Sequence, residues 1–440
     1  MTIHYFRVGL ALALTAASTA AAAGQATFRV VATLSNYAPS ELTEGSPGVF
    51  YTVGNGPALQ GGSAISVSSE GSITTLTIWP GGYNNVSQGL VGAANGRFYS
   101  SVEYSSFPAN IFSVASVPDS GKFYAGQSID PMLTQSLPDG TLLGDGIGPD
   151  GLWYLLRCGL DGAVTTFATL PSGQRVESVT YASDGNFYGV SLGEDIVSSS
   201  SNYAFRATSS GVLTTLYTFP LGAFERYSST PLLQATDGNL YGSTVTGGAN
   251  GTGMIYKLTL AGQFTLLYSF DQGKYTAGPT TLIEGSDGNL YGNAQSPDGV
   301  GQLFRITKSG QYTVLYQTSG PNAVYPCYLA QGSDGIIYGS AYLAASLYGE
   351  IFALDAGLPK PGPWVQHFTP QSGTPGAQVR IWGYNLLSAA VQFNGVPATT
   401  VSSSGPNYVL ATVPPAATTG PITITTPGGT VVTGTSFTVE

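Results

Sequence analysis

Histidine is nearly absent from this 440-residue sequence, which contains only His4 and His367. A Ser-His-Asp triad needs a histidine as its base, and zinc and iron sites commonly use imidazole ligands. The long stretch between these two residues can therefore form neither a triad nor a histidine-ligated metal site. We expect His367 itself to be a half-buried strand residue with a structural role.

Charge is scarce as well. Charged residues make up 9% of the chain, whereas about 25% is usual for soluble proteins. The 14 Lys and Arg residues are outnumbered by 24 Asp and Glu residues, which gives a net charge of −10. Such a chain offers no basic footprint for nucleic acid and no attraction to an anionic membrane surface. We expect neither to be a partner.

Long hydrophobic runs are also missing. The apolar run at residues 8–17 is shorter than the ~20 residues that a membrane-spanning helix needs, and no later segment is longer. Arg7 before this run and the small residues 21–23 after it are typical of a cleaved secretory signal. The sequence predicts a signal peptide over residues 1–23, a secreted or extracytoplasmic protein, and no membrane span.

A short repeat dominates the rest of the chain. The hexapeptide Asp287-Gly288-Asn289-Leu290-Tyr291-Gly292 recurs at 184–189 and 237–242, and weaker copies occur elsewhere. Neighbouring copies are separated by 44 residues (99 to 143) to 53 residues (188 to 241). The position of the tyrosine identifies seven repeat units, at Tyr51, Tyr99, Leu143, Tyr188, Tyr241, Tyr291 and Tyr338.

Each repeat unit predicts four short strands. In the clearest unit these are 280–285, 289–293, 302–307 and 311–316, and the Asp-Gly turn between the first two is a strong hairpin signal. Four strands per unit are typical of propeller blades. The last unit ends after a third strand at 350–354, and residues 26–34 supply an unpaired strand that would complete it and remove an exposed edge. The sequence therefore predicts an all-β fold with a seven-bladed β-propeller over 24–357, closed by an N-terminal strand.

The two cysteines fall in the third and seventh repeat units. An exported protein could form a disulfide, but these two units are not neighbours in a seven-membered ring. We therefore interpret Cys158 and Cys327 as small buried apolar residues.

Residues 183–316 resemble the GloVer-type tandem-repeat family, in which the DGNLYG element is followed by strands similar to 254–259 and 266–270. The resemblance implies an extracytoplasmic propeller and no assigned chemistry. The repeat is also similar to that of the virginiamycin B lyase family, which implies a seven-bladed propeller with a catalytic histidine and a magnesium ion. Because no histidine lies in residues 24–357 here, that activity is not carried over.

After a Pro-rich linker at 358–363, residues 364–440 resemble an IPT/TIG domain. The matching stretches are 368–373, 379–386, 391–396 and 419–424. The resemblance implies an immunoglobulin-like β-sandwich that serves as a binding or spacer module. Short alternating strands separated by Gly and Pro turns agree with a small sandwich.

Two recurrent residue types could be mistaken for site residues. The Asp of the repeat lies where Asp bonds its own backbone in a turn, and the repeat Tyr lies in mid-strand, where sheets pack face to face. We predict structural roles for both. The segment 145–151 is faintly similar to a calcium loop but lacks the EF-hand spacing, so we predict no metal site, no catalytic residue and no cofactor.

The connections between the second and third strands, and from the fourth strand to the next unit, are long and vary between units. They share one side of a propeller, and variable loops on a rigid scaffold commonly carry binding function. Aromatic and charged residues in them suit carbohydrate stacking or a protein contact. The predicted ligand-binding residues are Tyr83, Tyr104, Phe107, Glu194, Asp195, Phe224, Glu225, Arg226, Tyr227, Asp271, Lys274, Tyr275 and Tyr348.

The sequence thus predicts an exported, monomeric, non-enzymatic binding or structural protein whose ligand is an extracellular polysaccharide or a cell-surface protein. One alternative is a glycan hydrolase or lyase that uses paired loop carboxylates. Another is a purely structural array that spaces the C-terminal domain.

Overall fold

The computed structural model of the chain describes residues 26–34, 38–55, 62–78, 83–86, 89–93, 95, 97–104, 110–115, 121–124, 129–193, 202–220, 231–244, 246–271, 281–295, 300–318, 324–343, 349–402 and 408–440. Every regular element within these ranges is a β-strand, which confirms the all-β prediction for this part of the chain. No helix among the described residues could cross a membrane.

Seven small antiparallel sheets form between residues 27 and 355 of the described chain, numbered here in chain order. The first contains β2 (Ala38–Pro39), β4 (Val49–Asn55), β5 (Gly62–Ser68) and β6 (Ile73–Ile78), with β3 (Thr43–Ser46) paired to β4. The second contains β7 (Tyr83–Val86), β9 (Arg97–Tyr104), β10 (Asn110–Ala115) and β11 (Lys122–Tyr124), with β8 (Val91–Gly92) paired to β9. The third contains β12 (Asp130–Ser136), β13 (Leu142–Ile147), β14 (Trp153–Cys158) and β15 (Val164–Thr169).

The remaining four follow the same pattern. The fourth sheet contains β16 (Gln174–Tyr181), β17 (Phe187–Gly193), β18 (Tyr203–Ala207) and β19 (Leu213–Thr218). The fifth contains β20 (Leu233–Gln234), β21 (Leu240–Thr244), β22 (Met254–Leu258) and β23 (Phe264–Ser269). The sixth contains β24 (Leu282–Glu284), β25 (Leu290–Gln295), β26 (Gly301–Ile306) and β27 (Tyr312–Gln317). The seventh contains β28 (Val324–Gln331), β29 (Ile337–Leu343), β30 (Gly349–Asp355) and β1 (Thr27–Leu34).

The seventh sheet joins the two ends of this region. β1 pairs antiparallel with β30, with Thr27 opposite Asp355 and Leu34 opposite Gly349. This confirms the predicted pairing of the N-terminal strand with the last repeat unit. The outer edge of the seventh sheet is thus formed by residues at least 290 positions away in sequence from its other three strands.

The repeated hexapeptide forms the turn and second strand of a sheet. In the sixth sheet the Asp287 carboxylate accepts hydrogen bonds from the Asn289 backbone N–H (3.1 Å), the Asn289 side chain (2.7 Å) and the Tyr291 hydroxyl (2.9 Å). Gly288 has a φ of +78°, which glycine adopts without strain. A Cβ on Gly292 would lie 2.5 Å from the Phe304 ring. We call the hydrogen bond from the Tyr291 hydroxyl to Asp287 the repeat clasp. The turn, the clasp and the Phe304 ring beside Gly292 explain why the repeat has its polar residues and glycines at these positions.

Two further contacts join successive sheets. We call the first the inter-sheet latch. In it, a Gln or Glu in the first strand of one sheet accepts a hydrogen bond from a backbone N–H of the preceding sheet. The donor is the residue directly before the turn Asp of that preceding sheet. Gln234 accepts from Ser183 (2.7 Å), and Glu284 accepts from Thr236 (2.7 Å). The second contact is a ring stack between outermost strands. These pairs are Tyr217 with Phe264 (4.3 Å between centroids), Tyr268 with Tyr312 (4.2 Å) and Tyr316 with Phe28 (4.1 Å).

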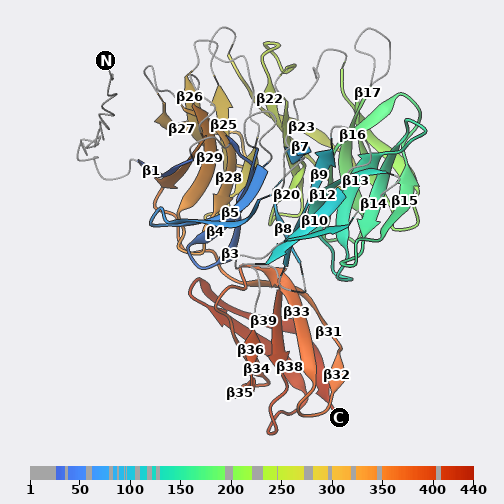
Figure 1. Cartoon of the computed structure of the whole chain (residues 1–440), viewed down its shortest axis with the longest axis vertical. Coiled ribbons are helices and arrows are strands. Elements are labelled where there is room, and N and C mark those ends of the chain that lie inside the picture. Colours follow the sequence, from blue (N-terminus) through green and yellow to red (C-terminus); the bar gives the residue numbers. More distant parts are fainter. Residues whose placement is uncertain are drawn as a thin grey trace, which may run out of the picture.

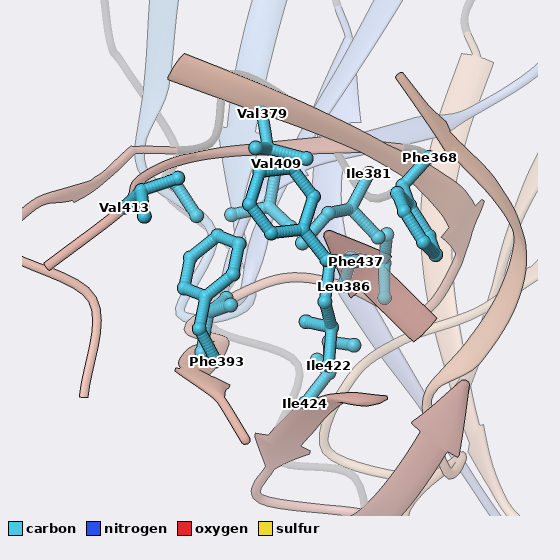
Figure 2. Close-up of a cluster of buried hydrophobic side chains, with 12 residues drawn as sticks. Phe368, Val379, Ile381, Leu386, Phe393, Val409, Val413, Ile422, Ile424 and Phe437 are labelled. Carbon is cyan, nitrogen blue, oxygen red and sulfur yellow. The ribbon is translucent and has the colours of Figure 1, made fainter. Parts of the chain in front are cut away.

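Two more sheets follow at the C-terminal end. The eighth contains β31 (Trp364–Thr369), β33 (Gln378–Tyr384), β37 (Tyr408–Thr412) and β36 (Val401–Ser402). The ninth contains β32 (Ser372–Gly373), β39 (Gly429–Val439), β38 (Gly420–Thr426), β34 (Ala390–Phe393) and β35 (Val396–Pro397). Their inner faces share one apolar core, in which Ile381 and Val409 from the eighth sheet meet Phe393 and Ile424 from the ninth (Figure 2). We call this pair the C-terminal sandwich, and Figure 1 shows it below the other sheets.

Both cysteines are free thiols. Cys158 is buried in an apolar cluster between the second and third sheets, as predicted. Cys327 is only half-buried, so the prediction that it is a buried residue holds only in part. Its Sγ donates to the Tyr325 carbonyl (3.2 Å).

Candidate functional site

The short turns of the sheets face the C-terminal part of the chain. Leu160, in the turn between β14 and β15, packs against Trp382 and Tyr408 of the C-terminal sandwich. The Ser286 hydroxyl, beside a repeat turn, donates to the Pro359 carbonyl (2.5 Å). In antiparallel sheets the other connections leave from the opposite end of the strands. That opposite side is where the sequence places the variable loops.

Most of the predicted ligand-binding residues lie outside the described residues. These are Phe107, Glu194, Asp195, Phe224, Glu225, Arg226, Tyr227, Lys274, Tyr275 and Tyr348. Asp271 is described and exposed, directly after the outermost strand of the fifth sheet. The structure therefore tests the position of only three of the thirteen.

The placement of Tyr83 and Tyr104 in connecting loops is wrong. Tyr83 begins β7, Tyr104 ends β9, and the two residues are opposite each other in the antiparallel ladder of the second sheet. Tyrosine and the neighbouring valines favour extended backbone, so the ladder runs further than the turn signals indicated. The structure brings this pair together at the end of β9 that lies away from its repeat turn.

The repeat aspartates and tyrosines have structural roles, as predicted, but they also bond to each other, which the sequence did not indicate. Tyr188, Tyr241 and Tyr338 each donate to the turn Asp four positions earlier, at 2.8 Å. Burial raises the pKa of Asp184, but hydrogen bonds from Asn186 and Tyr188 outweigh it and the net pKa shift is downward. Burial and the Asp184 carboxylate raise the pKa of Tyr188. The aspartate and tyrosine side chains therefore stabilise the turns.

An unanticipated polar cluster lies between the third and fourth sheets. Asp145 on β13 is 1% exposed, and its Oδ2 has no hydrogen-bond partner among the described residues. The charge of Glu177 acts on this carboxyl, and Glu177 occupies a bulge in β16 between Val176 and Ser178. Arg175 donates to Glu177 at 3.0 Å. Burial raises the pKa of the Asp145 carboxyl well above its usual range, and the Glu177 charge raises it further.

The chemistry of this cluster is that of a carboxyl pair with unequal environments. Burial disfavours the charged form of Asp145, while Glu177 forms an ion pair with Arg175. Such pairs are found in active sites and also in structural ion-pair networks. The described residues, this cluster included, contain no group of three or more His, Cys, Asp or Glu side chains that could hold a metal ion.

Sequence reasoning missed this pair because the two residues belong to different repeat units. Asp145 stands two positions after the Leu143 anchor, where the other units have Val53, Ser101, Val190, Ser243, Asn293 and Ser340. A charged residue at a position that is otherwise small, polar or apolar was a usable signal. Nothing in the spacing indicated that its neighbour would be Glu177, because a bulge directs that side chain.

Comparison with known proteins gives the family. A family model described as the Gloeobacter/Verrucomicrobia repeat matches residues 140–381, which is more than half of the chain. The chain belongs to this repeat family. The match begins in the turn before β13 of the third sheet, continues through β30 of the seventh sheet and ends within β33 of the C-terminal sandwich. Comparison with curated protein sequences gave no match.

Solved structures with a similar fold place the Gloeobacter/Verrucomicrobia repeat among β-propeller-like proteins. Virginiamycin B lyase from Staphylococcus aureus is 16% identical, with 75% of this chain and 99% of that chain covered and a TM-score of 0.55. A fungal alcohol oxidase of the AA5 family, solved in complex with copper, is 12% identical over 94% of this chain and 98% of that chain, with a TM-score of 0.51. At this identity the likeness shows the fold alone.

Proposed function

We propose that this protein is an exported, non-enzymatic binding protein that holds its ligand on the variable-loop side of a seven-bladed β-propeller. In this proposal residues 1–23 are a signal peptide, the seven sheets are the blades, and the C-terminal sandwich is an immunoglobulin-like IPT/TIG domain. The ligand is an extracellular polysaccharide or a cell-surface protein.

The proposal rests on the hydrogen bonds that the repeated polar residues make. The turn aspartates bond to the repeat tyrosines and to their own backbone, so the residues that recur in the chain maintain the scaffold. The short-turn side meets the C-terminal sandwich and the segment that precedes it. What varies between units lies on the opposite side, where binding residues on a rigid scaffold are usual.

Aromatic residues in the variable connections support a carbohydrate ligand. Tyr227 and Tyr275 lie in the connections that leave the fourth and fifth sheets, next to Arg226 and Lys274. Tyrosine rings stack on sugar faces through their apolar surface, and the hydroxyl and neighbouring charges supply hydrogen bonds. The acidic net charge of the chain favours neutral or cationic ligands over polyanions.

The test is retention of the mature chain, residues 24–440, on a glycan array and on immobilised polysaccharides. A Tyr227→Ala, Tyr275→Ala double variant removes two loop aromatics. A Val212→Ala, Val432→Ala double variant removes two side chains that are 60% and 55% exposed elsewhere on the molecule. We expect specific retention that the first variant loses and the second keeps. Loss in both, or no retention of any glycan, would reject the carbohydrate ligand.

A second candidate function is a glycan hydrolase or lyase, and one observation favours it. Burial and the Glu177 charge raise the pKa of the Asp145 carboxyl, which is the direction that a general acid requires. The test is turnover of any retained glycan by the wild-type protein and by Glu177→Gln. Turnover that the variant lacks would favour the enzyme, and retention without turnover would favour the binding protein.

A further inference from the structure

The contact between the third sheet and the C-terminal sandwich contains His367. This residue lies on β31 opposite Trp382 of β33, and the two rings are 6.1 Å apart with an interplanar angle of 15°. Trp382 in turn lies 5.3 Å from the Tyr408 ring. Leu160 from the third sheet packs onto Trp382 and Tyr408. The outward face of the eighth sheet is therefore an aromatic surface that packs against the turn carrying Leu160.

The turn that carries Leu160 is held firmly in place. Its Leu160 carbonyl accepts hydrogen bonds from the Tyr99 hydroxyl (3.0 Å) and the Tyr124 hydroxyl (3.1 Å), both in the second sheet. The other turn of the third sheet also reaches the sandwich, because the His367 ring donates to the Pro138 carbonyl. Both short turns of a single sheet thus form the platform on which the sandwich rests.

The aromatic face has more donors than acceptors. Trp382 is 4% exposed, and its Nε1 and the Nε of Arg380 find no hydrogen-bond acceptor among the described residues. The Arg380 guanidinium lies 5.7 Å from the Trp382 ring and 6.0 Å from the Tyr408 ring. A contact that leaves buried donors unmatched is held mainly by packing, and an added charge within it is costly because it must be desolvated.

Charged residues occur on three of the elements that form this contact. β33 contributes Arg380, which is already a cation on this face. The two turns of the third sheet contribute Asp139, which pairs with Arg157, and Asp161, which accepts the backbone N–H of Ala163 (3.1 Å). The two carboxylates therefore have partners of their own. β37 contributes no charged residue to the contact, only Tyr408 and Leu410.

We propose that this contact is a pH-gated joint, which holds the C-terminal sandwich against the third sheet while His367 is neutral and releases it when His367 is protonated. Release exposes Trp382, Tyr408 and Arg380 together as an aromatic and cationic surface.

The direction of the pH dependence follows from burial. Desolvation lowers the pKa of His367, and the hydrogen bond to the Pro138 carbonyl opposes this only in part. A released histidine has a pKa of about 6.5, so the released state binds more protons than the docked state as the pH falls below that value. Docking is therefore complete above about pH 7 and weakens as the pH falls through about 6.5.

The experiment measures the shape of the mature chain, residues 24–440, by small-angle scattering at pH 7.5 and pH 5.0. We expect the maximum dimension to increase at pH 5.0 and the tryptophan emission to shift to the red, and a Trp382→Phe variant to lose the emission shift. Leu160→Ala removes the packing contact without changing a charge, so it should increase the dimension at both pH values. Circular dichroism at each pH shows that the sheets stay folded.

The charge itself is tested with His367→Gln. This side chain stays neutral and can still donate to the Pro138 carbonyl, so the protein should remain docked at both pH values. An acid response equal to that of the wild type, or a wild type that does not respond, would overturn the proposal. Should His367→Gln be released at pH 7.5, His367→Asn repeats the test with a shorter amide. Release of both neutral variants would show that packing rather than protonation controls the joint, and would overturn the proposal as well.

Discussion

Glu44 and Ser333 are 289 positions apart in the sequence, yet the Glu44 carboxylate accepts both the Ser333 backbone N–H (2.8 Å) and the Ser333 hydroxyl (2.9 Å). The same inter-sheet latch joins Gln234 to Ser183 and Gln331 to Ser286. The first sheet is therefore attached to the seventh in the way that the fifth, sixth and seventh sheets are each attached to the one before. A closed ring of sheets requires such a contact between its first and last sheets.

The first prediction concerns this closing latch. Glu44→Ala leaves the Ser333 N–H without its acceptor in a half-buried site, and we expect the free energy of unfolding to fall by about 1–3 kcal/mol. Glu44→Gln restores one acceptor, as in Gln234 and Gln331, and should recover most of the loss. Urea denaturation monitored by circular dichroism measures both. Glu70→Ala, at an exposed position, is the control, and an equal loss in it would contradict the role of the latch.

The second prediction concerns the repeat clasp. Tyr291→Phe keeps the buried ring but removes the hydroxyl that donates to Asp287 at 2.9 Å. A hydrogen bond to a charged group contributes about 1.5–3 kcal/mol, and we expect a loss near the lower value because Asn289 continues to bond to Asp287. Thermal or urea unfolding measures the change. Tyr217→Phe is the matched control, since Tyr217 contributes a ring stack with Phe264. No difference between the two variants would count against the clasp.

How far the sequence predicts this fold depends on whether a contact repeats. The turn at Asp287 follows from a pattern that recurs along the chain, with Asp in five of the seven units and Tyr in six. The pairing of β1 with β30 follows from the missing fourth strand of the last unit. The electrostatic effect of Glu177 on Asp145 and the packing of Leu160 on Trp382 occur once each. They depend on which strands face each other across two sheets, and one-off contacts leave no period in a sequence.

The residues predicted to lie in loops show a different error, because the turn signals end the strands too early. Gly, Asn and Pro signals mark where a turn can start, but they do not fix how many residues continue an antiparallel ladder beyond it. Tyr83 and Tyr104 were placed in loops for that reason, and backbone pairing within the second sheet extends to include them. Turn signals in the sequence therefore do not locate the end of a strand to within a few residues.

The third prediction concerns the ring stack that holds the N-terminal strand. Tyr316 on β27 stacks on Phe28 of β1 at 4.1 Å with an interplanar angle of 2°. Tyr316→Leu keeps an apolar side chain but removes the stack, and such pairs contribute about 0.5–1.5 kcal/mol beyond buried area. We expect faster amide hydrogen exchange in β1 together with this loss of stability. Tyr217→Leu removes the equivalent stack between the fourth and fifth sheets, so it should cost a similar amount and leave exchange in β1 unchanged.

The fourth prediction concerns Asp145 and its pH dependence. Burial raises the pKa of this carboxyl well above its usual range, and Glu177 raises it further. The unfolded carboxyl has a pKa of about 3.9, so between that value and the folded pKa the folded state binds more protons than the unfolded state. The stability that Asp145 contributes is then complete below about pH 4 and is lost as the pH rises towards the folded pKa.

Asp145→Asn keeps the shape of the side chain, removes its titration and introduces an amide N–H donor in place of a carboxyl oxygen. We therefore expect the variant to match the wild type at pH 4 and to have a higher melting temperature at pH 7, as measured by differential scanning calorimetry across that range. Asp271→Asn, at an exposed position, should follow the wild type throughout. A variant that is less stable than the wild type at pH 7 would mean that the ionised Asp145 carboxylate has a stabilising partner, and the interpretation of this pair as a neutral acid beside an anion would be wrong.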